Sequence, residues 1–77
     1  MKKNKWLVWW KDGSVTVWDA AQWTAAQIAA TANHVTAALC TEETAKEVAI
    51  WWREYGVESF APMEDVARCM AEAVEAS

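Results

Sequence analysis

The sequence predicts a small α+β domain in which an N-terminal antiparallel β-hairpin packs against two or three α-helices. Residues 5–19 are rich in β-branched and aromatic side chains and are interrupted by Asp12-Gly13, a pair typical of a tight hairpin turn. After residue 41, apolar residues recur at the three- and four-residue spacing of amphipathic helices. The chain has 77 residues, of which 55% are hydrophobic, so residues 1–77 suffice for one core in a single domain.

The hairpin is expected to present two apolar faces. A two-residue type I′ turn at Asp12-Gly13 would place Leu7 opposite Trp18. Side chains alternate between the two faces along each strand. One face would then consist of Leu7, Trp9, Thr16 and Trp18, and the other of Trp6, Val8, Trp10, Val15 and Val17. A single hairpin therefore has two apolar surfaces to cover.

The segment between the hairpin and residue 41 is expected to form a helix and then a third strand. Asp19 and Gln22 have the spacing of a capping box, which predicts a helix from residue 19 to about residue 32. Asn33 suits a left-handed residue at its end. Residues 35–40 alternate as in a short strand, although their alanines also suit a continued helix. We favour the strand, because a two-stranded sheet alone is marginally stable.

Two further helices are expected after residue 41. Thr41 suits an N-cap because acidic residues follow it in the first turn, and Gly56 suits the end of this helix. Pro62 suits the first turn of the last helix, after a short connection in which Phe60 is expected to plug the core. The residues expected to face the core are Ala45, Val48, Ala49, Trp52, Met63, Val66, Ala67, Met70 and Val74.

Charge is distributed unevenly along the chain. Residues 1–11 carry four lysines and no acidic residue, whereas residues 12–77 carry three basic and eleven acidic residues, a net charge of −8. An acidic body argues against nucleic acid as the partner and favours a protein with a basic surface. Two cysteines are too few for a disulfide framework, and the apolar run after the first lysines is too short for a signal peptide. We therefore expect a cytoplasmic protein.

No pattern in the sequence points to catalysis, a metal or a cofactor. His34, Cys40 and Cys69 match no zinc-ligand spacing, and two glycines are too few for a phosphate-binding loop. The acidic pairs that begin two of the expected helices are explained by the helix dipole. Residues 20–41 are uncharged but too polar to span a membrane, and a helix-turn-helix over residues 24–36 would lack Lys and Arg for phosphates. We expect neither an enzyme nor a membrane protein.

The seven tryptophans are more indole than a core of this size can enclose, because each buries about 150–250 Å². We expect two or three of them to stay partly exposed and to anchor a protein contact within a charged rim. The predicted contact residues are Leu7, Trp9, Trp18, Trp23, Trp51, Glu42, Glu43 and Glu47. One alternative is a homodimer formed through the same surface. Another is single-stranded nucleic acid stacked on the hairpin tryptophans between Lys2, Lys3, Lys5 and Lys11.

The hairpin WLVWWKDGSVTVW, together with the small size, the acidity and the helices without active-site residues, gives the chain a family resemblance. It resembles small phage- or mobile-element-encoded inhibitors of the anti-CRISPR kind. The resemblance implies a non-enzymatic protein that blocks a host protein, such as a CRISPR or other defence effector, by occupying its surface in the host cytoplasm. It carries no functional residue over to this chain.

Overall fold

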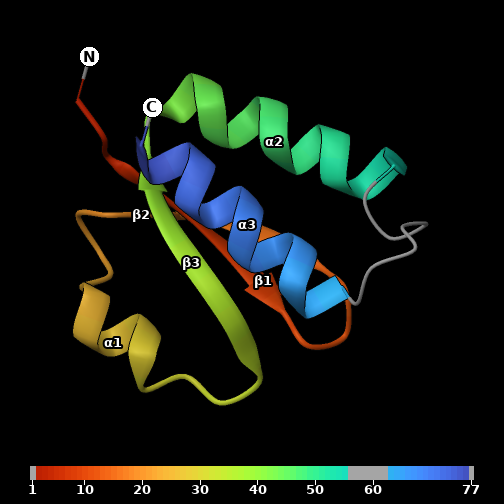
Figure 1. Ribbon diagram of the computed structural model, residues 1–77. Coiled ribbons are helices and arrows are strands. Elements are labelled where there is room, and N and C mark those ends of the chain that lie inside the picture. Colours follow the sequence, from red (N-terminus) through yellow and green to blue (C-terminus); the bar gives the residue numbers. More distant parts are fainter. Residues whose placement is uncertain (1, 56–62, 77) are drawn as a thin grey trace.

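The computed structural model describes residues 2–55 and 63–76, so the expectations for Gly56, Phe60 and Pro62 lie outside the described residues. These residues form three strands and three helices. Figure 1 shows their α+β arrangement with an N-terminal hairpin, as predicted. The third strand is confirmed. In chain order the elements are β1 Lys5–Trp10, β2 Val15–Asp19, α1 Ala25–Ala29, β3 His34–Cys40, α2 Glu42–Tyr55 and α3 Met63–Ala76.

The hairpin turn is one residue longer than expected. The Gly13 N–H donates to the Trp10 carbonyl at 3.0 Å, and the Trp10 N–H donates to the Ser14 carbonyl at 2.9 Å, which closes a three-residue loop over residues 11–13. Only Gly13 in this loop has a positive φ, of 90°, as in a type I turn followed by a glycine bulge. Asp12 stabilises the loop, because its Oδ1 accepts from the Ser14 N–H and hydroxyl at 2.9 and 2.6 Å. The two-residue turn was therefore a wrong prediction.

Because the turn is one residue longer, each side chain of β2 lies on the opposite face of the sheet from the one predicted. The strands pair antiparallel in the order β2-β1-β3, with Leu7 opposite Val17 and Trp9 opposite Val15. A shift of one residue turns every side chain of a strand to the other face. The first face consists of Leu7, Trp9, Val15, Val17, Ala38 and Cys40, and the second of Trp6, Val8, Trp10, Thr16, Trp18 and Leu39. Grouping Leu7 and Trp9 with Trp18 on one face is therefore wrong.

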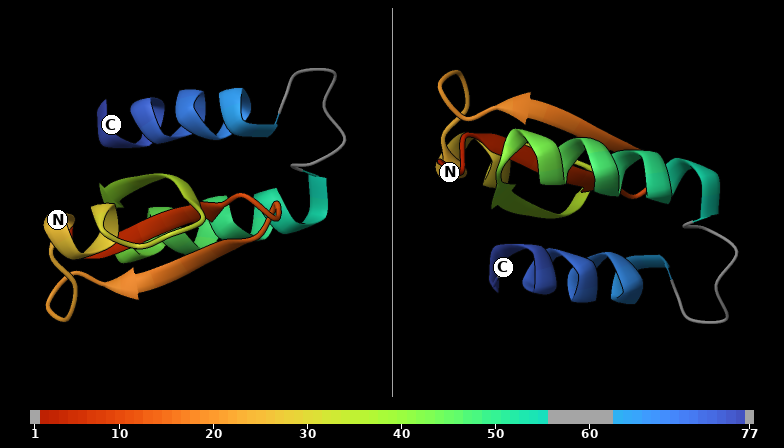
Figure 2. Two further views of the ribbon diagram at one scale, coloured as in Figure 1. Left: turned by 90° about the horizontal axis from the view of Figure 1, so that it is seen from below. Right: turned by 90° about the horizontal axis from the view of Figure 1, so that it is seen from above.

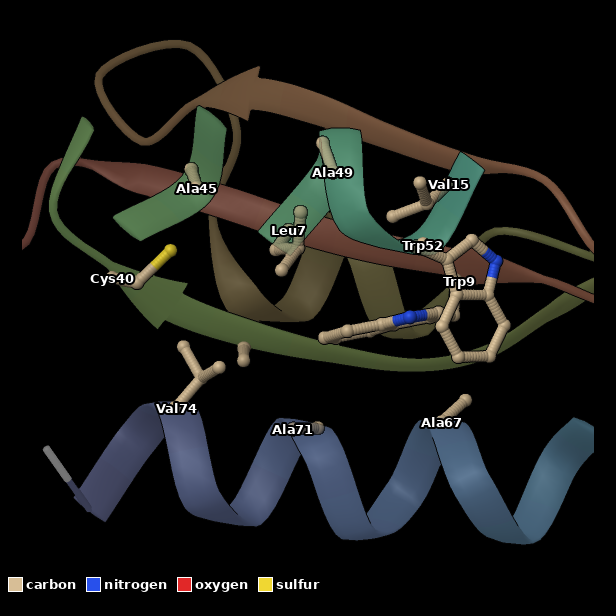
Figure 3. Close-up of a cluster of buried hydrophobic side chains, with 11 residues drawn as sticks. Leu7, Trp9, Val15, Cys40, Ala45, Ala49, Trp52, Ala67, Ala71 and Val74 are labelled. Atoms are coloured by element: carbon tan, nitrogen blue, oxygen red, sulfur yellow. The ribbon is translucent and has the colours of Figure 1, made fainter. Parts of the chain in front are cut away.

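The hydrophobic core lies between the first face of the sheet and the helices α2 and α3. Helix α2 packs on β1 and β2, and α3 packs on β3 (Figure 1). The buried cluster consists of Leu7, Trp9, Val15, Ala38, Cys40, Ala45, Ala49, Trp52, Ala67, Ala71 and Val74, most of which Figure 3 labels. The predicted inward residues of both helices belong to this cluster or pack against it, so their orientation is confirmed.

The segment before α1 lies against the second face of the sheet, where Val8 of β1 is fully buried. The helix α1 itself begins later than predicted. Its N-cap is Thr24, whose hydroxyl accepts from the Gln27 N–H while the Gln27 side chain accepts from the Thr24 N–H. The Thr24–Gln27 capping box has the same spacing as the expected one at Asp19, which instead holds a turn through its carbonyl and Oδ1. Ile28 is the buried residue of this five-residue helix. Asn33 has φ 72°, which confirms its left-handed conformation, but it does not end the helix. The helix α1 ends at Ala29, and Asn33 lies directly before β3.

Candidate functional site

The seven tryptophans divide into core and surface residues. Trp9 and Trp52 are fully buried and meet edge to face, with ring centroids 6.1 Å apart. Trp51 is 46% exposed on α2. The remaining four are half-buried, and all of them lie on or beside the second face of the sheet. Part of the indole surface therefore stays outside the core, as expected, but five tryptophans do so and not two or three.

Three half-buried tryptophans form a continuous row on the second face, which we call the indole row. Trp10 of β1 meets Trp18 of β2 at an angle of 64°, with centroids 5.4 Å apart. Trp18 in turn stacks on Trp23, at 4.2 Å and 21°. Offset and edge-on contacts of this kind are favourable arrangements of aromatic rings. The row therefore presents a connected aromatic surface and not three separate side chains.

Hydrogen bonds hold the indole row in place. The Trp10 indole N–H donates to the Thr16 hydroxyl at 2.9 Å. The Trp6 indole N–H donates to the Trp23 carbonyl at 3.0 Å and ties the segment before α1 to the sheet. Beside Trp10 lies an open hollow of about 610 Å³, which residues 32 and 33 and the hairpin turn also line. A surface ordered before binding loses less conformational entropy when a partner docks.

The first face, which was expected to be the contact surface, is the covered one. Leu7 and Trp9 are 0% exposed and lie against α2 and α3. The prediction that they contact a partner directly is therefore wrong. The one-residue shift of β2 also brings Val15 into the core beside them. Trp18 and Trp23, by contrast, lie in the indole row.

The other predicted contact residues lie on a different side of the molecule. Glu42, Glu43, Glu47 and Trp51 are exposed on α2, which covers the first face of the sheet, whereas α1 and the indole row belong to the second face (Figure 1). Glu42 forms a surface ion pair with Lys46, at 3.5 Å. The acidic residues and the indole row therefore do not form one contiguous surface.

A second surface, which the sequence analysis missed, lies where β2 meets α2. Val17 and Ile50 are 36% and 56% exposed there. With Lys46, Ala49 and Arg53 they line a groove of about 390 Å³, which we call the edge groove. Ile50 lies outside the inward-facing stripe of α2. This position in the sequence could have indicated an exposed apolar residue on the helix. Val17 could be placed only once the true register of β2 was known.

The His, Cys, Asp and Glu side chains are the candidates for a metal site. No three His, Cys, Asp or Glu residues in these ranges are grouped so that they could hold a metal ion. Cys40 and Cys69 are both free thiols, and burial raises the pKa of the Cys40 thiol. His34 makes a local contact through Nδ1 with the Thr31 carbonyl, at 2.8 Å.

Comparison of the chain with known protein families, curated proteins and solved structures finds no match. In the described part of the chain, none of the helices has the length and apolar character needed to cross a membrane. The function must therefore be argued from the geometry of the indole row and of the edge groove.

Proposed function

We propose that this protein is a non-enzymatic binding module that docks another protein on its indole row. The observation that carries the proposal is the contact series Trp10–Trp18–Trp23, on the face of the sheet opposite the one on which α2 and α3 pack. Aromatic side chains are enriched at protein interfaces and dominate their binding energy. A connected apolar patch that stays partly exposed on a folded domain commonly marks an interaction site.

The acidic residues of α2 support this proposal through their long-range field and not as contacts. Glu43 and Glu47 are exposed on the side of the molecule that lies away from the indole row. The chain as a whole carries a net charge of −4. A net charge of this sign attracts a partner with a basic surface and accelerates its association.

The alternative of single-stranded nucleic acid has less support. Lys5 lies 3.8 Å from the Asp19 carboxylate, and the Lys3 Nζ donates to the Glu75 carbonyl at 2.7 Å. These two ammonium groups therefore already have partners within the chain and are less available to the phosphates of a nucleic acid. Trp18 and Trp23 also stack on each other, so the faces in mutual contact are closed to a base.

The proposal is tested by affinity capture from host lysate with the wild-type chain and two variants. Trp23→Ala removes one end of the indole row from a loop outside the sheet, while Trp51→Ala is the matched control on α2, which packs on the opposite face. We expect one retained protein to be lost with Trp23→Ala, kept with Trp51→Ala, and shown to bind the purified chain by calorimetry. Loss with neither variant, or no retained protein, would contradict the proposal.

The finer part of the proposal is that the partner is a host defence effector and that binding blocks it. Its support is the resemblance to small phage-encoded inhibitors, and an activity assay of the captured protein with stoichiometric addition of the chain tests it. Titration of labelled oligothymidine at low and high salt addresses the alternative, because tight and strongly salt-dependent binding would favour nucleic acid.

A further inference from the structure

The strand β2 is an open edge of the sheet. Among the residues that the structure describes, β1 is its only neighbour in the sheet, and in Figure 2 β2 (orange) forms the outer edge of the sheet. The other edge is protected, because β3 packs against α3 and the Leu39 N–H donates to Glu75 Oε1 at 3.4 Å. An open edge offers a row of backbone donors and acceptors to an added strand.

Three residues of β2 direct their backbone groups away from the sheet. The Ala20 N–H donates to the Asn4 carbonyl at 3.0 Å, so the even-numbered positions of this strand turn toward β1. Antiparallel ladders alternate, and Val15, Val17 and Asp19 therefore turn their N–H and C=O groups outwards. These three residues form the free edge.

The two ends of this edge are partly occupied. The Arg53 guanidinium donates to the Val15 carbonyl at 3.4 Å. The Asp19 carbonyl accepts from two N–H groups of the following turn, at 3.0 and 3.2 Å. The Val17 N–H and C=O have no hydrogen-bond partner among the residues that the structure describes. An added strand is therefore centred on Val17.

A second copy of the same strand fits this edge, because opposite charges would meet at its two ends and apolar side chains would meet between them. In an antiparallel pair with Val17 opposite Val17 of the second copy, Val15 lies opposite Asp19 of that copy. The Asp19 side chain projects from the first face, as Val15 does, so in this pairing it would lie beside Arg53 of the other copy. Its carboxylate would then be shared between Arg53 and Lys5, which lies 3.8 Å away within the same chain. The exposed apolar residues Val17 and Ile50 lie between these two charged ends.

We propose that the β2 edge pairs two copies of this chain across a two-fold axis at Val17. The dimer has one continuous six-stranded sheet, with an Asp19–Arg53 ion pair at each end of the new ladder and the two edge grooves facing each other. The interface is isologous, so each contact occurs twice. It leaves both indole rows on the second face, and it does not depend on the function proposed for them.

Sedimentation equilibrium over a range of chain concentrations tests this pairing. Arg53→Glu places an acid against Asp19 of the second copy, and Asp19→Arg places a base against Arg53. We expect each variant alone to dissociate about tenfold more readily or worse, because both end contacts become repulsive. An equimolar mixture of the two variants is expected to regain the wild-type dimer, because both end contacts are then attractive.

Two further variants serve as a control for the change of charge and as a replacement for a variant that does not fold. Arg68→Glu makes the same change of charge as Arg53→Glu but on the exposed surface of α3, and it should leave the dimer intact. Val17→Lys puts two like charges at the two-fold axis and replaces Asp19→Arg if that variant fails to fold. A wild-type chain that remains monomeric would overturn the proposal and leave the edge to a strand of another protein. A dimer that survives both Arg53→Glu and Val17→Lys would overturn it as well.

Discussion

Replacing each of the two buried tryptophans by phenylalanine should have unequal effects, although both changes remove the same atoms. Trp52 is 1% exposed, and its indole N–H donates to the Gly13 carbonyl at 2.9 Å. Trp9 is 0% exposed, and within the described structure its indole N–H has no hydrogen-bond partner. Figure 3 shows the two rings side by side in the core. Both substitutions leave a cavity of similar size, so its cost largely cancels in the comparison.

The expected difference follows from the two N–H groups. Trp52→Phe loses a hydrogen bond with a net value of about 0.5–1.5 kcal/mol. Trp9→Phe removes a buried N–H that has no hydrogen-bond partner, and burying such a group costs about 1–3 kcal/mol. Its removal therefore offsets part of the destabilisation caused by the cavity. Trp52→Phe should therefore be the more destabilising substitution by about 1.5–4.5 kcal/mol. That is a large part of the roughly 4–12 kcal/mol expected for the unfolding of a domain of this size.

Urea unfolding followed by far-ultraviolet circular dichroism measures this difference. The dependence on denaturant should be the same in both variants and in the wild type, so that a shift in midpoint reports stability alone. Equal destabilisation by the two substitutions, or greater destabilisation by Trp9→Phe, would refute the argument that the unpaired N–H of Trp9 destabilises the folded state.

Three smaller predictions concern single residues. Cys69 is exposed, whereas Cys40 is buried with its pKa raised by burial, so a native chain should take up one equivalent of thiol reagent quickly and a second only on unfolding, as counted by mass spectrometry. Asn33 has φ 72°, so Asn33→Ala should cost about 1–2 kcal/mol in thermal unfolding while Asn33→Gly is tolerated. Hydrogen bonds from Ser14 lower the pKa of Asp12 below 3.8, so its stabilising contribution is present above that pH and is lost as pH falls through the lowered value. Asp12→Ala should flatten this part of the acid-unfolding curve, and an unchanged curve would contradict the role given to the turn.

Much of the fold follows from local patterns in the sequence. The two long helices have strong N-terminal signals and a regular apolar stripe, and Thr41 accepts the Thr44 N–H at 3.2 Å as an N-cap should. The short helix is less predictable, because Asp19–Gln22 and Thr24–Gln27 have equivalent capping patterns and only the packed structure distinguishes them. The third strand depends on pairing with β1 over most of its length, which alanine-rich periodicity does not reveal.

The candidate surface depends on one local choice that the sequence leaves open. Asp-Gly suits both a two-residue turn and a three-residue turn with glycine at its end, and the two differ by one residue in register. In the shorter turn, Trp18 would share a face with Leu7 and Trp9, so the core would need to enclose a third indole. The longer turn gives that place to Val15 and sends Trp18 to the second face, where it meets Trp10. The left-handed Gly13 therefore decides at once which side chains fill the core and which tryptophans can meet a partner.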